Sequence, residues 1–217
     1  MILKNSIIIL IACLLFSCSN NKKDQTSQYN SDKSITEKTE GYSEHKNAYF
    51  GDLHVHTSWS FDAFIYNVRT TPDDAYNYGK GKAIDHVSGE QIQLGRPLDF
   101  MAVTDHAEYM GIMMQMLDDE SPIAKLEIAD RIRNPDRGVS KRAFGEIGIS
   151  IARNEPKADL LQKEIMQGVW KEIVDAANRH NKPGQFTTFA GYEWTSLPSE
   201  RSAAIPFARN MHRNVIY

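Results

Sequence analysis

Apolar residues along the chain mark a small number of strands and helices. Residues 98–104 form a short, nearly continuous apolar run, which is typical of a buried strand. Apolar side chains recur at every third or fourth position between residues 158 and 180, and this spacing predicts an amphipathic helix. Segments 186–194 and 211–217 have the composition of two further strands, and a first strand is expected around residues 50–56.

The segments between these strands are predicted to be mostly helical. Thr71-Pro72-Asp73-Asp74 begins one helix, because proline suits the first helical position and acidic side chains suit the first turn. Residues 84–97 are expected to form an irregular loop or a small hairpin. Residues 109–157 are expected to be helical, with loops near Pro122, Pro135 and Gly138. The order strand, helix, strand, helices, strand indicates an α/β fold with a mostly parallel sheet.

The first residues have the pattern of an export signal. Lys4 precedes an apolar run, residues 7–16, that is too short to span a bilayer as a helix. The run ends in Leu15-Phe16-Ser17-Cys18, which resembles a bacterial lipobox, and Cys18 would then carry the lipid. An ordinary cleaved signal or a membrane anchor is the alternative. We therefore expect an exported protein, lipid-anchored at the bacterial cell envelope, at the outer membrane or the periplasmic face.

Composition divides the chain into three parts. Residues 1–18 form the predicted signal, and residues 19–47 form a polar, flexible tether with almost no apolar side chains. Residues 48–217 are long enough for one folded domain. The net charge of -3 leaves no basic footprint for nucleic acid. Both cysteines lie in the signal segment, so any metal in the folded domain must be held by nitrogen and oxygen ligands.

Metal-type side chains occupy the ends of the predicted strands. The two histidines of the first strand lie two residues apart, so their side chains face the same way. Chemistry in parallel α/β folds gathers at the carboxyl ends of strands, and we therefore expect these side chains to meet. Neutral imidazoles and carboxylates suit Zn, Mn or Fe. The candidate ligands are His54, His56, Asp62, His106, Glu193 and His212.

Several separated motifs resemble one family. The stretch from Gly51 to Asp62 looks like the first motif of the PHP (polymerase and histidinol phosphatase) superfamily, Val103–His106 resembles its second, and Gly191–Glu193 its third. With Arg96–Phe100 and Met211–Val215, the pattern is similar to the DUF3604 family of PHP-like proteins, from about Ala48 to the last residue. The resemblance implies a distorted (β/α)7, TIM-like barrel with two or three divalent metals at its mouth.

The resemblance also implies a role for each candidate ligand. One metal would be held by His54 and His56, a second by Glu193 as a bridging ligand together with His212, and a third by Asp62 and His106. PHP sites draw a further His and an Asp-x-His from later strands, which this sequence does not contain. The chain also ends within the apolar segment 211–217. We therefore expect an N-terminal fragment of the barrel, with the C-terminal strands missing.

The implied activity is that of a metal-dependent hydrolase, a phosphoesterase that uses a metal-bound hydroxide on a small anionic substrate. Two alternatives stay open: amidohydrolase-like hydrolysis of non-phosphate bonds, and a non-catalytic surface binding lipoprotein. Asp52 and Asp105 are expected either to orient an imidazole or to cap local turns. Arg213 is a candidate contact to the substrate, and Glu108 is a candidate acid or base. Trp194 is expected to be a packing residue.

Overall fold

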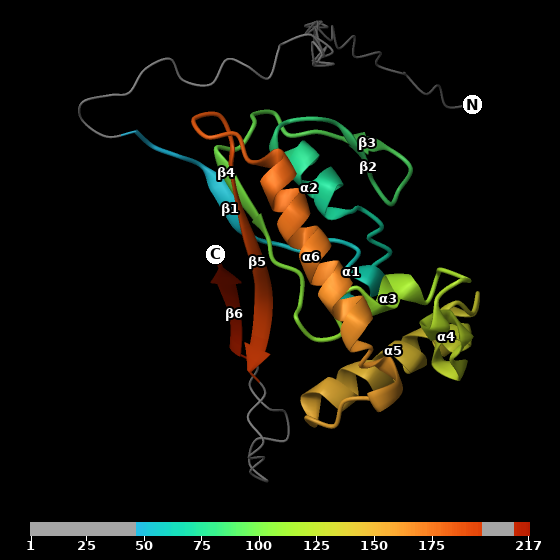
Figure 1. Cartoon of the computed structure of the whole chain (residues 1–217). Helices are drawn as coiled ribbons and strands as arrows, with labels where there is room; N and C mark the ends of the chain where they lie inside the picture. Colours follow the sequence, from blue (N-terminus) through green and yellow to red (C-terminus); the bar gives the residue numbers. More distant parts are fainter. Residues whose placement is uncertain (1–46, 197–210) are drawn as a thin grey trace, which may run out of the picture. The chain divides into compact units, whose positions relative to one another are not determined.

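Three parallel strands make up most of the sheet. The computed structural model describes residues 47–196 and 211–217. Strands β1 (Gly51–Val55), β4 (Phe100–Val103) and β5 (Thr187–Ser196) lie side by side in that order, and both pairings are parallel. Strand β6 (Met211–Ile216) pairs with the other side of β5 in the antiparallel direction (Figure 1). The domain is thus mixed α/β, with a parallel sheet that ends in an antiparallel strand.

Strand β5 continues past the point where the sequence predicted its end. Glu193 was expected at the end of a strand, but it lies inside β5, opposite Asn214 of β6. The antiparallel partner keeps the backbone extended as far as Ser196. A hydrophobic pattern predicts that a segment forms a strand, but it carries no information on the direction of its neighbour. The extension and the antiparallel pairing were therefore not predicted.

The sheet is curled, so that its two edge strands approach each other. Asn214 lies on β6 at one edge, and its side-chain amide donates a hydrogen bond of 2.8 Å to the carbonyl of Leu53 on β1, at the other edge. This contact joins the two edges across the inner face of the sheet. The side chains on that face are thereby drawn together.

Two helices cover the outer face of the sheet. Helix α2 (Pro72–Gly79) begins with a capping box formed by Thr71 and Asp74, as its proline and acidic residues predicted. Helix α6 (Lys163–His180) packs beside α2 and along β5 (Figure 1). Burial of apolar area between these layers stabilises the fold. The buried residues of this core are Ala75, Tyr76, Met101, Val103, Ala176, Ala177 and Phe186.

The remaining elements form a second, mainly helical core. They are α1 (Phe61–Ile65), α3 (Ile112–Gln115), α4 (Glu127–Ile132), α5 (Arg137–Ala152) and the 3-10 turns Pro122–Lys125 and Ala158–Leu160.

Outside both cores, the segment 84–97 forms the small hairpin of β2 (Ile84–Asp85) and β3 (Gln91–Ile92), as one of the two predicted forms.

Two predicted helix boundaries are wrong. The helix expected from residue 158 begins at Lys163, after a separate 3-10 turn. The loop expected near Gly138 lies before it, because the Asp136 side chain accepts a hydrogen bond from the Gly138 N–H and so caps the start of α5.

The segments predicted to carry export and anchoring lie outside the described residues. They include the signal over residues 1–18 with Cys18, and the tether as far as residue 46. Within the described part of the chain, none of the helices has the length and apolar character needed to cross a membrane.

Gly51 leaves no room for a side chain at the start of β1. A Cβ atom there would lie 2.3 Å from the carbonyl oxygen of Phe100 on β4. We expect Gly51→Ala to lower the free energy of unfolding by about 1–3 kcal/mol, because the strand must shift away from its neighbour. Urea denaturation measures the change.

Gly145→Ala is the matched control for this substitution. A Cβ atom at Gly145 of α5 would meet nothing within 4 Å. The control is therefore expected to leave stability unchanged or to raise it by up to about 1 kcal/mol, because alanine favours the helix. Equal stability of the Gly51 variant and wild type would show that β1 does not need its close approach to β4.

Candidate metal centre

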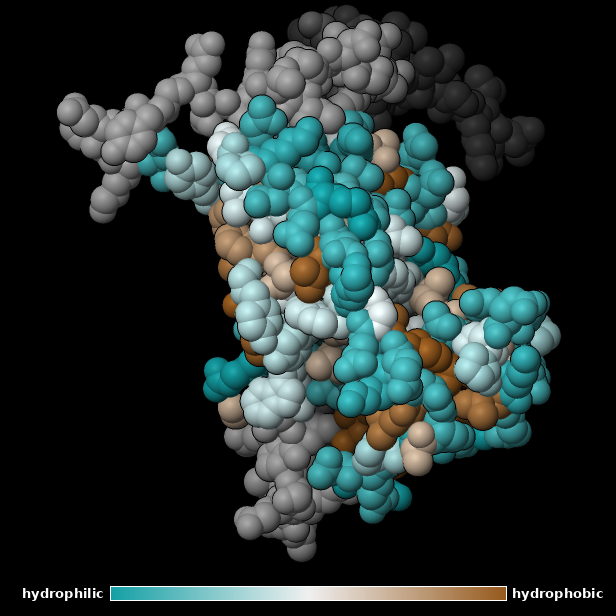
Figure 2. All heavy atoms as spheres, viewed as in Figure 1, coloured by the Kyte–Doolittle hydropathy of each residue, from teal (hydrophilic) through white to brown (hydrophobic). Residues whose placement is uncertain are grey.

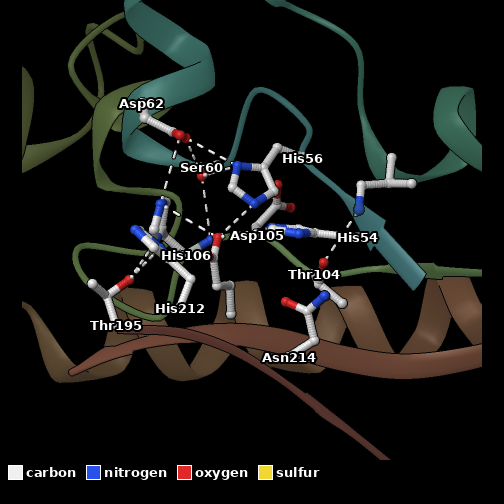
Figure 3. A network of polar contacts seen from close by, with 12 residues as sticks. His54, His56, Ser60, Asp62, Thr104, Asp105, His106, Thr195, His212 and Asn214 are labelled. Atoms are coloured by element: carbon white, nitrogen blue, oxygen red, sulfur yellow. Dashed lines mark hydrogen bonds and ion pairs between the residues drawn. The ribbon is translucent and has the colours of Figure 1, made fainter. Parts of the chain in front are cut away.

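Four histidines surround one buried carboxylate. Glu193 on β5 is only 1% exposed. Its Oε2 atom is 3.2 Å from Nε2 of His54 and 2.7 Å from Nε2 of His56. The same oxygen is 3.4 Å from Nε2 of His106, and Oε1 is 2.5 Å from Nδ1 of His212. Figure 3 shows these imidazoles pointing toward one another from different parts of the sheet.

The backbone of the sheet brings these residues together. His106 lies three residues beyond the end of β4 and forms a parallel bridge with Glu193. The N–H of Glu193 donates to the carbonyl of Asp105 at 3.0 Å, and the N–H of Ala107 donates to the carbonyl of Glu193 at 2.8 Å. His212 reaches the same place from β6, where it is paired with Thr195. Pairing of β4, β5 and β6 therefore places residues that are distant in the sequence at one point.

Asp62 joins this group from the first turn of α1. Its Oδ1 atom lies 3.1 Å from Nδ1 of His56 and accepts a hydrogen bond of 2.6 Å from the Ser60 hydroxyl. Its Oδ2 atom lies 3.6 Å from Nε2 of His106. Burial raises the pKa of Asp62, but hydrogen bonds with His106, His56 and Ser60 outweigh this effect and hold the pKa well below its usual range. Asp62 is therefore an ionised carboxylate between two imidazoles.

We call the six residues His54, His56, Asp62, His106, Glu193 and His212 the histidine–carboxylate cluster. Three groups within it have ligand atoms that all lie within 4.8 Å of one another. They are His54, His56 and Glu193; His56, Asp62 and His106; and His106, Glu193 and His212. Each group combines imidazole nitrogen with carboxylate oxygen, and these donors suit Zn, Mn or Fe.

Two ligand atoms at the centre of the cluster lack hydrogen-bond partners. Nε2 of His56 and Oε2 of Glu193 are buried and lie 2.7 Å apart, yet neither has a partner with hydrogen-bond geometry. Buried polar atoms are normally satisfied, so such a pair needs an explanation. A cation held between the two atoms would satisfy both. The residues present therefore fit a divalent metal.

The carboxylates of the cluster favour a positive charge between the imidazoles and Glu193. Burial lowers the pKa of His106, but hydrogen bonds to Asp62 and Glu108 outweigh it and raise the pKa to about 9. The pKa of His56 is also raised, because the interaction with Asp62 outweighs burial. Burial raises the pKa of Glu193, but the neighbouring histidines lower it below its ordinary value. A divalent cation would take the place of the protons that these carboxylates attract.

Of the two roles predicted for Asp52 and Asp105, orientation of an imidazole is wrong, and local hydrogen bonding to the backbone agrees with the structure. Asp52 accepts a hydrogen bond of 2.9 Å from the backbone N–H of His54. Asp105 is fully buried and accepts hydrogen bonds from the N–H and the hydroxyl of Thr57, at 2.5 and 2.7 Å. Burial raises the pKa of Asp105 to about 6, although the bonds from Thr57 oppose the shift. Both aspartates instead shape the local backbone that carries His54 and His56.

Arg213 is not placed to contact a substrate at the cluster. It lies between His212 and Asn214 on β6, so its side chain points to the opposite face of the strand. In the described part of the chain, Arg213 is exposed and no hydrogen bond or ion pair joins it to the cluster. Solvent reaches the cluster elsewhere, because the side chains of His54 and His212 are 52% and 45% exposed.

Two hydroxyl groups of the site were given no role by the sequence. The Thr195 hydroxyl lies 3.1 Å from Nδ1 of His106 and 3.2 Å from Nδ1 of His212. The Ser60 hydroxyl accepts a hydrogen bond of 3.2 Å from the backbone N–H of His106 and donates to Asp62. Thr195 follows Glu193 by two residues, and the alternation of side chains along a strand is the signal that would have placed it on the same face. No comparable signal marks Ser60.

A cavity of about 440 Å³ adjoins the cluster. Its wall includes Glu108 and Thr195, which both contact His106. Trp194 also lines it and is 47% exposed, so the expectation that Trp194 is a packing residue is wrong. Apolar side chains from the end of α5, from the turn before α6 and from the first turn of α6 complete the wall; they are Ile151, Leu161 and Met166. Figure 2 shows apolar atoms at the surface of the mainly helical part of the molecule.

The fold and the cluster together describe a mixed α/β domain with a candidate metal centre, which lies where β4, β5 and β6 bring their ligands together. A family model described as "Protein of unknown function (DUF3604)" matches residues 43–217, which include the whole cluster. The chain therefore belongs to the DUF3604 family. No curated protein and no solved structure matches it.

Proposed function

We propose that the domain is a metal-dependent hydrolase and that its substrate is a phosphoester. The observation that carries this proposal is the position of the Glu193 carboxylate, which is buried and within 3.4 Å of an imidazole nitrogen of each of four histidines. Such a site supports reaction at a metal better than it supports a structural role, because two of its histidines are about half exposed to solvent.

The chain's own residues would hold two or three ions of Zn, Mn or Fe. The three groups overlap at His56, His106 and Glu193, and because a neutral imidazole has one lone pair, Glu193 is the one of these three that could serve two ions. Glu193 is suited to bridge, because Oε2 faces His54 and His56 while Oε1 faces His212. When bound, such ions supply Lewis acidity and activate water near neutral pH.

The remaining side chains of the site would position these ligands and the substrate. Asp62 holds His56 through Nδ1, which leaves Nε2 directed at Glu193. The substrate would approach from the exposed side of His54 and His212. The adjoining cavity, with Trp194 on its wall, offers space for the organic part of an ester.

A second candidate is amidohydrolase-like hydrolysis of a non-phosphate bond. A phosphate substrate favours Arg or Lys beside the metals. Across residues 47–196 and 211–217, no arginine or lysine forms a hydrogen bond or ion pair with the cluster, and Arg213 faces away from it. This observation favours a less strongly anionic substrate. The metal ligands are the same in both candidates.

We further propose that the domain is a PHP-like barrel in an exported, lipid-anchored protein. Support for the barrel comes from the curled sheet, its three parallel strands, and helices α2 and α6 on its outer face. The antiparallel β6 departs from a regular (β/α) repeat. Support for export and anchoring comes from the apolar run over residues 7–16 and from Cys18.

Metal analysis followed by a substrate screen tests the hydrolase proposal. We expect the purified chain to retain divalent metal and to hydrolyse p-nitrophenyl phosphate or its diester more rapidly than p-nitrophenyl acetate or an anilide. His54→Ala is expected to remove this activity, because it deletes a ligand. His86→Ala is the matched control, since His86 is an exposed histidine whose ring forms hydrogen bonds only with Ser88 among the described residues.

The possible results separate the candidates. Hydrolysis of the acetate or the anilide, but not of phosphates, would replace the phosphoesterase by the second candidate. Bound metal without hydrolysis of any substrate would indicate a non-catalytic binding protein. A chain that retains no divalent metal after loading would contradict every metal-dependent function.

A further inference from the structure

Glu108 lies behind His106, on the side of the imidazole away from Glu193. It is on the loop that follows β4, and its side chain is 19% exposed. Its Oε2 atom lies 3.2 Å from Nδ1 of His106. Its Oε1 atom accepts a hydrogen bond of 3.1 Å from the backbone N–H of Thr195 on β5. Both carboxylate oxygens are therefore occupied, one by a candidate ligand and one by a neighbouring strand.

We propose that Glu108 is a positioning residue that selects the tautomer of His106 able to bind a metal through Nε2. The inference rests on the metal centre of the proposed function. When a metal takes the lone pair of Nε2, the remaining N–H of the His106 ring is on Nδ1, where Oε2 of Glu108 is placed to accept its hydrogen bond. A neutral imidazole has one N–H, so a proton on Nδ1 leaves the lone pair on Nε2. That atom faces Oε2 of Glu193 at 3.4 Å and Oδ2 of Asp62 at 3.6 Å.

The hydrogen bond to the second oxygen of Glu108 holds the carboxylate in place beside His106. The Thr195 N–H belongs to β5, two residues beyond Glu193, so it fixes the carboxylate relative to the central ligand. The Thr195 hydroxyl lies 3.1 Å from the same Nδ1 of His106 and can accept a bifurcated hydrogen bond from it. The loop after β4 and strand β5 thus hold the ring from behind.

The cluster contains the same arrangement a second time. Asp62 contacts Nδ1 of His56, whose Nε2 points at Glu193. In proteins that bind metals through histidine, a carboxylate on the other ring nitrogen commonly fixes orientation and tautomer. Glu108 had been a candidate acid or base, but its carboxylate faces the ring nitrogen turned away from Glu193. It therefore acts through His106 rather than on a substrate.

Glu108→Gln tests this role because the amide has one accepting oxygen and one donating nitrogen. If the oxygen keeps the Thr195 N–H, the amide nitrogen faces Nδ1 of His106 and requires that atom to accept. The proton then moves to Nε2 and blocks it. We expect the zinc affinity, measured by competition with a chelating dye, to fall by about 10–100-fold. Glu108→Asp keeps an acceptor-only group and is expected to restore part of the affinity.

A second readout follows the tautomer directly. In the chain saturated with zinc, ¹H–¹⁵N spectra should place the His106 proton on Nδ1 in wild type, and that Nδ1–H signal should be absent from Glu108→Gln. Glu155→Gln, at an exposed glutamate, is the matched control and should change neither measurement.

The two measurements keep the two proposals separate. A Glu108→Gln variant that keeps the wild-type Nδ1–H signal, or that binds zinc as tightly as wild type, overturns the role of Glu108. A wild-type chain that binds no zinc overturns the proposed function, and because Nε2 of His106 then has no metal to bind, it overturns the ligand-positioning role as well. Wild-type zinc binding, with loss of the Nδ1–H signal and weaker affinity in the variant, supports both.

Discussion

Glu193→Gln is expected to weaken metal binding by the domain strongly. The substitution keeps the size of the side chain but replaces a carboxylate with an amide at the one point that all four histidines contact. Loss of a residue behind a ligand typically weakens binding by about 10–100-fold, and the loss of a shared ligand should exceed that range. We therefore expect a decrease of more than about 100-fold in affinity for zinc or manganese, measured by calorimetric titration.

Thermal unfolding gives an independent measure of the same loss. A metal at about 100 times its dissociation constant stabilises wild type by about 2.7 kcal/mol, and the variant should show almost no such stabilisation. Glu164→Gln, at an exposed glutamate in the first turn of α6, is the control and should keep the full metal response. If Glu193→Gln binds metal as wild type does, the carboxylate is not a ligand and the cluster must be explained without it.

Asp105→Ala is expected to give the largest loss of stability without any change to a ligand. The Asp105 carboxylate is fully buried and accepts two hydrogen bonds from Thr57, on the segment that leads from His56 to α1. Its removal leaves the buried Thr57 N–H and hydroxyl without their acceptor. Each hydrogen bond to a charged group contributes about 1.5–3 kcal/mol, and part of this is offset by the cost of burying the carboxylate. We expect the free energy of unfolding to fall by about 2–4 kcal/mol in urea denaturation at neutral pH.

The control for this substitution is Asp119→Ala. Asp119 is exposed, and a surface change of this kind should alter stability by no more than about 0.5 kcal/mol. A weaker metal affinity in Asp105→Ala is also expected, because the loosened segment carries His56. A stability equal to that of the control would contradict the view that Thr57 and Asp105 hold this segment in place.

Much of the cluster could be predicted from local sequence signals. His54 and His56 lie two apart at the end of the predicted first strand, and His106 follows a short apolar run, so their side chains were expected at strand ends. Their convergence on Glu193 agrees with that expectation. The residues around them were harder to predict. Glu108, Thr195 and Ser60 are ordinary polar residues, and their contacts depend on which loop folds over which strand.

The roles that sequence reasoning assigned to Asp105 and Arg213 failed for a common reason. Proximity to a ligand in the sequence does not say which way a side chain points when the strand ends or the backbone turns. Asp105 turns inward to Thr57. Arg213 alternates to the face opposite His212. Direction is settled by the partners available in the fold, and these come from distant parts of the chain.

The amino-acid sequence by itself determined the alternation of strands and helices, the capping of α2, membership of the DUF3604 family and the types of ligand present. Those features depend on spacing and on side-chain chemistry, which are local. Only the tertiary structure decided that β6 runs antiparallel and that Asn214 links the two edges of the sheet. It also decided that one carboxylate, Glu193, lies at the centre of four histidines. These features depend on the curl of the sheet, which arises from pairing between segments far apart in the chain.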